Sequence, residues 1–456
     1  MKQLLRRILF PVLSCLLLAL LAACSSVPTP GGTPSSGNGQ QGNSGGTPTT
    51  SNGNNGSGNG GTPTSSTQPM PQTSTSCPAT GTARAMVTAN LVLGNHNNIV
   101  YVVNEYQPGS NSTPKAGTLK RYDASSGAKT VIAGIPNVSI ESAQISADGK
   151  WILFTTVNSG QSTLQLVRMD GQGLQTLFCF TGAGIANPQW SSDQQHVIFS
   201  VFQTGLEKVY LLTIGTGNLQ TAMSIPDGGP GQGVSVRTWL DNSRVYLTDI
   251  QVDQPPDKIY ILNINNGTNQ SVSSLPALVN KTFGDFDSSY DGSQLYVDYG
   301  LCGQGGCYPP SSITAQAATG GAQTTVLNEP NYDVTTVRAV TSGTLLLVIN
   351  NAQVAGSNDI SHNGLWRMKP DGSGLTRLTT DPTHQSSALN TTTQFPWSNF
   401  SRDSQTYALE TTSYTQNNSA SYTYTLEYGS LNGGSPTIFA SISDGTRLSI
   451  AGWTTM

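Results

Sequence analysis

"QISADGKWILFTT", residues 144–156, places an Asp-Gly pair directly before a run of Trp, Ile, Leu and Phe. Asp-Gly tolerates the positive φ that a tight hairpin turn requires. A short apolar run bounded by a turn signal is typical of a strand that is covered on both faces. The stretch therefore predicts a first strand, a turn and a buried second strand.

The same pattern recurs along the chain. Its turn residues are separated by roughly 45 to 60 residues, in or just beyond the range of propeller blades, and they are Asp148, Asp193, Asp241, Asp291, Ser342 and Asp403. A second strand-turn-strand follows each apolar run, as in "LQLVRMDGQGLQTLF" (164–178) and "LWRMKPDGSGLTRLT" (365–379). The sequence thus predicts an all-β fold, a β-propeller of about seven four-stranded blades, with six or eight as alternatives.

The C-terminus indicates how the ring closes. "RLSIAGWTTM" (447–456) resembles a first strand, with Trp453 where Trp190 and Trp239 stand, but no turn follows it. We expect this strand to complete the blade that begins with residues 99–105, because closure leaves no blade with a missing strand.

The repeated aspartates are expected to be structural. Asp148, Asp193, Asp241, Asp291 and Asp403 would accept hydrogen bonds from nearby backbone N–H groups of their turns. The alternative is a ring of metal-binding aspartates, but the acidic cluster "DFDSSYDG" (285–292) does not have the spacing of a calcium loop. The four histidines form no metal-binding spacing such as H-E-x-x-H; they are His96, His196, His362 and His384. The sequence predicts no catalytic residue, no metal site and no cofactor.

The first residues, "MKQLLRRILFPVLSCLLLALLAAC", have a basic start, an apolar core and small residues before Cys24. The segment resembles the lipobox of bacterial lipoproteins. That resemblance implies cleavage of a signal peptide, residues 1–23, and acylation of Cys24, through which the protein would contact membrane lipid. An uncleaved transmembrane anchor is the alternative.

Residues 24–76 consist almost wholly of Gly, Ser, Thr, Asn, Pro and Gln. Such a segment buries too little apolar surface to offset its ordering entropy, so we expect a disordered linker. As a flexible coil it would span on the order of 40 Å and hold the folded head, residues 77–456, away from the membrane.

Four cysteines remain after the signal and Cys24. Cys302 and Cys307, in "LCGQGGCYPP", are expected to form a disulfide, since an exported protein meets oxidising conditions. A metal site there would need further ligands, and no histidine is near in sequence. Cys77 and Cys179 are a possible second pair, which would attach the end of the linker to the propeller.

The repeats resemble the WD-repeat-like propeller repeats of the TolB family, most closely at Ser146–Thr156 and Leu365–Thr379. TolB carries an N-terminal α/β domain where this chain has a linker. The resemblance therefore implies a propeller that acts as a platform for contacts, and it does not imply TolB's own partners.

Charged residues make up only 10% of the chain and the net charge is −4, which excludes a typical nucleic-acid binder. We expect an extracytoplasmic, lipid-anchored protein at the cell surface or in the periplasm, with a monomeric head that binds a protein or glycan and is not an enzyme. The alternative is a polysaccharide-acting lyase or hydrolase with its site at the central funnel. The stripe "SYTYTLEY" (421–428) predicts either a contact patch or strand packing.

Overall fold

The computed structural model describes residues 73–110, 112–182, 184–203, 206–226, 233–250, 258–274, 281–303, 306–329, 332–341, 343–350, 360–382, 384–390, 395–417 and 419–456. The chain divides into two units, Met1–Met70 and Pro71–Met456, and every described residue belongs to the second. The predicted signal, Cys24 and nearly all of the linker lie outside the described residues. Among the described residues, no helix has the length and apolar character needed to cross a bilayer.

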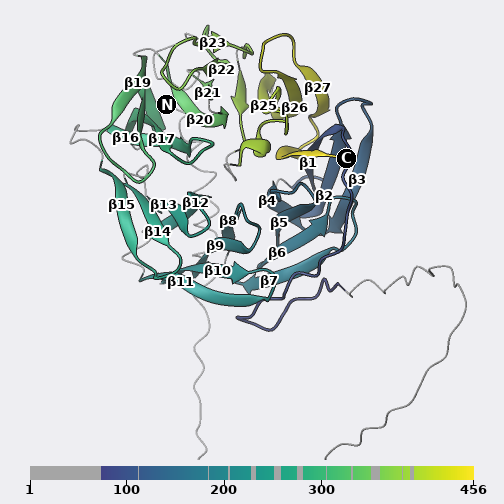
Figure 1. Cartoon of the computed structure of the whole chain (residues 1–456). Coiled ribbons are helices and arrows are strands. Elements are labelled where there is room, and N and C mark those ends of the chain that lie inside the picture. The colour runs from purple at the N-terminus through teal and green to yellow at the C-terminus, as the bar shows by residue number, and fades with distance from the viewer. Residues whose placement is uncertain are drawn as a thin grey trace, which may run out of the picture. The chain divides into compact units, whose positions relative to one another are not determined.

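The described residues form seven four-stranded antiparallel sheets that stand as blades in a ring (Figure 1). Blade 1 contains β28 (Arg447–Thr455), β1 (Asn97–Tyr106), β2 (Pro114–Asp123) and β3 (Lys129–Pro136). Blade 2 contains β4 (Ser139–Ile145), β5 (Trp151–Asn158), β6 (Gln161–Arg168) and β7 (Gln175–Thr181). Blade 3 contains β8 (Ile185–Trp190), β9 (His196–Gln203), β10 (Leu206–Thr213) and β11 (Asn218–Pro226).

The other four blades follow in chain order. Blade 4 contains β12 (Gly233–Trp239), β13 (Arg244–Ile250), β14 (Lys258–Asn263) and β15 (Asn269–Ser274). Blade 5 contains β16 (Lys281–Ser288), β17 (Gln294–Gly303), β18 (Gly306–Ala317) and β19 (Thr324–Glu329). Blade 6 contains β20 (Val334–Thr341), β21 (Thr344–Ile349), β22 (Gly364–Met368) and β23 (Thr376–Arg377). Blade 7 contains β24 (Gln385–Ala388), the 3-10 helix η2 (Pro396–Ser398), β25 (Thr406–Asn417), β26 (Ser419–Ser430) and β27 (Thr437–Ile442).

The C-terminal strand closes the ring. β28 pairs antiparallel with β1, with Ile99 opposite Trp453 and Val102 opposite Ser449. Trp453 is completely buried, so the last strand carries a large share of its blade's packing. The predicted closure and the predicted count of seven blades are both confirmed.

Residues 144–156 show why the second strands are apolar throughout. In β5, Trp151 and Leu153 pack into the cluster shared with blade 3, whereas Ile152 and Phe154 pack into the cluster shared with blade 1. Alternate residues of a strand point to opposite faces. A second strand therefore meets a neighbouring blade on each face, and both sets of side chains must be hydrophobic.

Candidate functional site

The propeller has two unlike ends. One end, here called the turn face, holds the turns between the first and second strands and between the third and fourth strands of each blade. The other end, the loop face, holds the connections between second and third strands and the connections from blade to blade. Because binding residues concentrate on loops that a rigid scaffold positions, the loop face is the first candidate for a binding surface.

The repeated aspartates lie in the turn face and are hydrogen-bonded within their own turns. The Oδ1 atom of each accepts a bond from the backbone N–H two residues later, at Lys150, Gln195, Ser243, Ser293 and Gln405. In four of these turns a serine two residues before the aspartate donates its hydroxyl to the same Oδ1, namely Ser146, Ser191, Ser289 and Ser401. The carboxylates thus stabilise hairpins, as expected for a structural role.

In the turn at Asp291, the hydrogen bonds also favour the ionised carboxylate. The Ser289 and Ser293 hydroxyls and the Ser293 amide lower the pKa of Asp291 to about 2. The serine two residues before the aspartate also accepts a hydrogen bond from the first residue of the next strand. In the turn at Asp148, the Trp151 N–H donates to Ser146 Oγ at 3.0 Å. These turns are therefore held by hydrogen bonds among their own residues.

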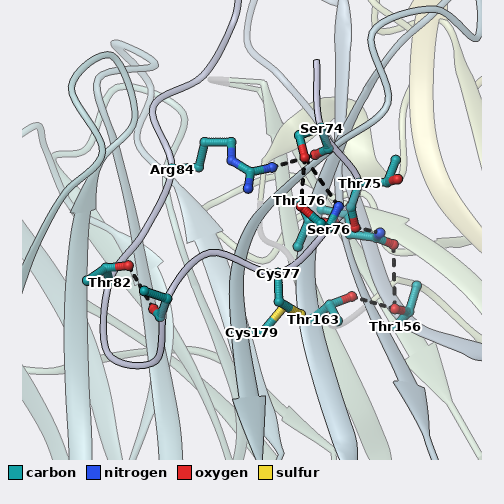
Figure 2. The surroundings of a disulfide bond; sticks show 12 residues. Ser74, Thr75, Ser76, Cys77, Thr82, Arg84, Thr156, Thr163, Thr176 and Cys179 are labelled. Carbon is teal, nitrogen blue, oxygen red and sulfur yellow. Dashed lines mark hydrogen bonds between the residues drawn. A yellow bond between two sulfur atoms is a disulfide. The ribbon is translucent and has the colours of Figure 1, made fainter. Parts of the chain in front are cut away.

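A disulfide joins Cys77 to Cys179 of β7 (Figure 2). It anchors a segment, residues 73–93, that we call the strap. Along the strap, the backbone N–H of Arg84 donates to Leu177 O at 2.8 Å, and that of Met86 donates to Ile214 O at 2.7 Å. The strap therefore runs from blade 2 to blade 3 and is held by backbone hydrogen bonds as well as by the disulfide.

Near the disulfide, the strap also covers part of the outer strand β7. The Thr176 N–H donates to Ser74 O at 2.9 Å and the Arg84 guanidinium donates to the same carbonyl at 2.8 Å (Figure 2). Outer strands expose unpaired backbone groups that invite association with other chains. In blade 2 the strap satisfies some of these groups.

Cys302 and Cys307 face each other in the register of β17 and β18. Their side chains lie outside the described residues, so the predicted disulfide between them stays a prediction.

The histidines are spread over the ring. His96 precedes β1 and lies 3.2 Å from Asp123, His196 begins β9, His362 precedes β22, and His384 precedes β24. In the part of the chain that the structure describes, no group of three or more His, Cys, Asp or Glu side chains is arranged to hold a metal ion.

Two carboxyl groups, one buried and one half-buried, connect neighbouring blades near the ring's inner strands. Glu207 accepts a hydrogen bond from the Val234 N–H at 2.8 Å, and Glu410 accepts one from the Ile450 N–H at 2.7 Å. In both cases the donor lies in the inner strand of the next blade. We call these contacts latches.

Burial raises the pKa of Glu207 and of Glu410 to about 7, because the charged form loses its hydration and gains only hydrogen bonds. Neutral side chains make equivalent latches elsewhere. Asn104 accepts from the Ile140 N–H and Gln144 accepts from the Trp190 N–H, each at 2.8 Å. No local sequence signal predicts the latches, since they depend on how adjacent blades are rotated.

Charges also meet across the inner strands β12, β16 and β20. Asp285 binds Arg237 at 2.9 Å and contacts Arg338 through its other oxygen, which also accepts from the Val337 N–H at 3.1 Å. Beside them, burial raises the pKa of Asp287 to about 7, although Arg338 opposes the shift. Asp285 is therefore committed to contacts within the protein.

Aromatic side chains gather on the loop face. Tyr106 carries the Arg447 guanidinium 5.3 Å from its ring centre. Trp366 stacks near His362 at 6.2 Å between ring centres, and Arg377 lies over the indole at 5.8 Å. The predicted tyrosine stripe divides in two. Tyr424 and Tyr428 pack against blade 1, as the packing alternative expected, whereas Tyr422 is 48% exposed.

Comparison with known proteins supports the fold. No family model matches the sequence. The β-propeller domain of the Trilobed protease from Pyrococcus furiosus matches with a TM-score of 0.50 at 12% identity, over 75% of this chain and 94% of that one. A prolyl endopeptidase matches with a TM-score of 0.54 at 12% identity, over 78% of this chain but only 50% of that chain.

TolB from Acinetobacter baumannii also matches, with a TM-score of 0.41 at 14% identity. The alignment covers 60% of this chain and 62% of the TolB chain. At these identities the likenesses concern the fold and not the function. The described residues of this chain form a TolB-like β-propeller of seven blades.

Proposed function

We propose that the protein is an extracytoplasmic lipoprotein, anchored to a bacterial membrane through acylated Cys24, whose propeller binds a protein or a glycan on its loop face and catalyses no reaction. The observation that carries the proposal is the contrast between the two ends of the ring. The turn face consists of short hairpins closed by their own Ser and Asp side chains, whereas the loop face carries aromatic residues from several blades.

The carboxyl groups that join neighbouring blades support binding over catalysis. A hydrolase or lyase at the central funnel requires carboxyl or imidazole groups that are available to a substrate. Glu207, Glu410 and Asp285 instead each accept a hydrogen bond from a backbone amide of the neighbouring blade.

The strap supports the anchored arrangement. The Cys77–Cys179 disulfide fixes, on blade 2, the point where the predicted linker ends. Any pull on the linker is then borne by a covalent bond to β7 and not by hydrogen bonds alone.

The anchor is tested by labelling growing cells with radioactive palmitate. We expect label in the wild-type protein and none in Cys24→Ala. Equal labelling of the two proteins, or no label in either, contradicts the lipoprotein assignment.

The binding face is tested with the full-length protein in detergent. Lys115→Cys places a thiol on the loop face and Tyr290→Cys places one on the turn face, and each is coupled to polyethylene glycol maleimide. The native side chains are exposed, at 57% for Lys115 and 66% for Tyr290. We expect the polymer to prevent pelleting with delipidated cell envelope only when it is attached at residue 115. Equal pelleting of both conjugates would contradict the assignment of the loop face.

A further inference from the structure

The hairpin of β25 and β26 projects beyond the rest of blade 7. β24 pairs with β25 no further than Ser413, and β27 pairs with β26 no further than Tyr424. Past these residues β25 and β26 continue to pair with each other, from Tyr414 opposite Tyr422 to Asn417 opposite Ser419. We call this two-stranded extension, residues 414–417 and 419–423, the arm.

An aromatic row crosses the base of the arm. The Tyr414 and Tyr422 ring centres are 5.3 Å apart, and the His384 ring meets Tyr414 edge-on with the centres 6.4 Å apart. The backbone N–H of Tyr414 donates to His384 O at 2.9 Å, which fixes the three residues side by side. Aromatic side chains on directly opposite residues stabilise paired strands.

The aromatic row lies on the hairpin face that, nearer the centre of blade 7, packs against blade 1. Tyr414 and Tyr422 lie on the same face of the hairpin as Ala408 and Leu426, which pack into the core shared with blade 1. Tyr422 is nevertheless 48% exposed. An exposed aromatic row at the edge of a rigid core is typical of a recognition surface, since rings give contact area at low cost in conformational entropy.

The chemistry of the arm favours an uncharged, hydroxyl-rich ligand. Residues 411–426 contain no Asp, Glu, Lys or Arg, and their polar groups are hydroxyls and amides. A pyranose ring offers a face of C–H groups that stacks on an aromatic ring and a rim of hydroxyls that bonds to such side chains. An acidic polymer or an anionic membrane would instead require cationic groups, and on the adjacent blade Lys115 already pairs with Glu105 at 2.8 Å.

A protein partner is less well matched to the arm. Stable protein interfaces bury about 800 Å² on each side around a hydrophobic core, whereas the neighbours of Tyr414 and Tyr422 in sequence are mostly Thr, Ser, Asn and Gln. We propose that the arm, with the row His384, Tyr414 and Tyr422, is a binding site for a neutral polysaccharide. This inference rests on the proposed function and specifies the ligand class of the loop face.

Affinity electrophoresis tests the site. The full-length protein in detergent is run through gels that contain dextran, mannan, laminarin or xyloglucan, and through gels that contain the acidic polymers polygalacturonate or alginate. We expect retardation by at least one neutral polymer and none by the acidic ones. Retardation by acidic polymers alone, or by no polymer, overturns the inference.

Three variants locate the binding. Tyr422→Ser should weaken binding about tenfold or more, because a central aromatic contact is lost. Tyr422→Phe, which keeps the ring, should bind within a few-fold of the wild type. Tyr290→Ser, an exposed tyrosine of the turn face, should bind as the wild type does. Equal binding by Tyr422→Ser and the wild type overturns the inference.

The same variants separate this inference from the proposed function. If polyethylene glycol attached at residue 115 prevents envelope binding but the substitution Tyr422→Ser does not, the loop face is a binding platform and the arm is not its glycan site. If envelope binding is lost after protease treatment of the envelope and persists after glycosidase treatment, the ligand is a protein and the arm proposal is wrong. If the conjugates at residues 115 and 290 both still bind the envelope while Tyr422→Ser no longer binds a neutral polysaccharide, the arm is a glycan site. The proposal that the whole loop face is a binding platform is then wrong.

Discussion

At the scale of single residues, the turn face depends on one backbone conformation. In four of the five turns, the residue after the aspartate has a positive φ, namely Gly149 (75°), Gln194 (61°), Gly292 (69°) and Ser404 (56°). Glycine adopts this conformation without steric penalty, whereas other residues lose about 1 kcal/mol or more. Gln194 and Ser404 show that the Ser and Asp hydrogen bonds hold the turn even without glycine.

Gly149 has a second requirement, which is space. A Cβ atom there would lie 2.9 Å from Thr454 Oγ1 and 3.2 Å from Leu93 Cδ1. Gly127 has nearly the same φ, 73°, but its nearest neighbour would be the Tyr122 hydroxyl at 4.0 Å. Gly149→Ala should therefore lower the free energy of unfolding more than Gly127→Ala, by about 1 kcal/mol or more beyond the shared backbone cost.

Urea unfolding of the two variants measures this difference. The Thr454 hydroxyl donates to Gly149 O at 2.8 Å, so the contact also joins blade 2 to the closing strand. Equal losses in the two variants would show that the backbone conformation alone matters at residue 149.

At the scale of strands, the latches give the ring a dependence on pH. The pKa of Glu207 and of Glu410 is raised to about 7 in the folded protein, against about 4.3 for an unperturbed glutamate. The unfolded chain therefore releases these protons at lower pH than the folded chain does. Stability from each group is fully present below the unfolded pKa, falls as the pH rises, and levels off above about 7.

Glu207→Gln and Glu410→Gln keep an oxygen acceptor but cannot ionise. In each variant, the decrease in the free energy of unfolding between pH 5 and pH 8 should be smaller than in the wild type, by up to about 3 kcal/mol. Urea unfolding at several pH values measures this difference. Glu105→Gln is the control, because Glu105 is exposed and pairs with Lys115. A fall that is as steep in both latch variants as in the wild type would mean that these carboxyls are ionised in the folded state.

The strap gives a prediction of its own. The Cys77–Cys179 disulfide spans 102 residues of sequence, and a closed loop of that length is expected to contribute about 4.7 kcal/mol by restricting the unfolded chain. The Cys77→Ala, Cys179→Ala double variant should lose about that much in urea unfolding. The Cys302→Ala, Cys307→Ala variant should lose less, since any bridge there closes a very short loop. The reverse order would contradict the entropic account.

Strands and turns were predictable because their signals are local. The Asp-Gly turn and the apolar run of residues 144–156 each follow from neighbouring residues, and the same holds for the repeats at Trp190 and Trp239. The latches, the Asp285 ion pairs and the arm were not predictable. Each depends on the rotation between blades or on where a flanking strand stops pairing. Neither of these two properties can be predicted from a short window of sequence.

At the scale of the whole molecule, one strand joins the two ends of the ring. β28 pairs with β1, and its Trp453 and Ile450 pack into the core that blades 1 and 7 share. The His96 N–H and the Met456 O pair at 3.2 Å, and the Met456 N–H and the His96 O pair at 3.0 Å. Removing the strand therefore exposes the faces of two blades and leaves the inner edge of β1 unpaired.

Deletion of residues 446–456 should prevent the head from folding to a protease-resistant state, because a fully buried tryptophan alone contributes about 3–5 kcal/mol and native proteins are stable by only about 5–15 kcal/mol in all. A synthetic peptide of the deleted residues should restore protease resistance and the near-ultraviolet circular dichroism of the wild type when it is present during refolding. The same peptide with Ala at the position of Trp453 should restore neither, since that indole fills the space between the first and last blades. If the truncated chain were already resistant without any peptide, β28 would be an accessory strand and the ring would be held closed by contacts between blades 1 and 7 alone.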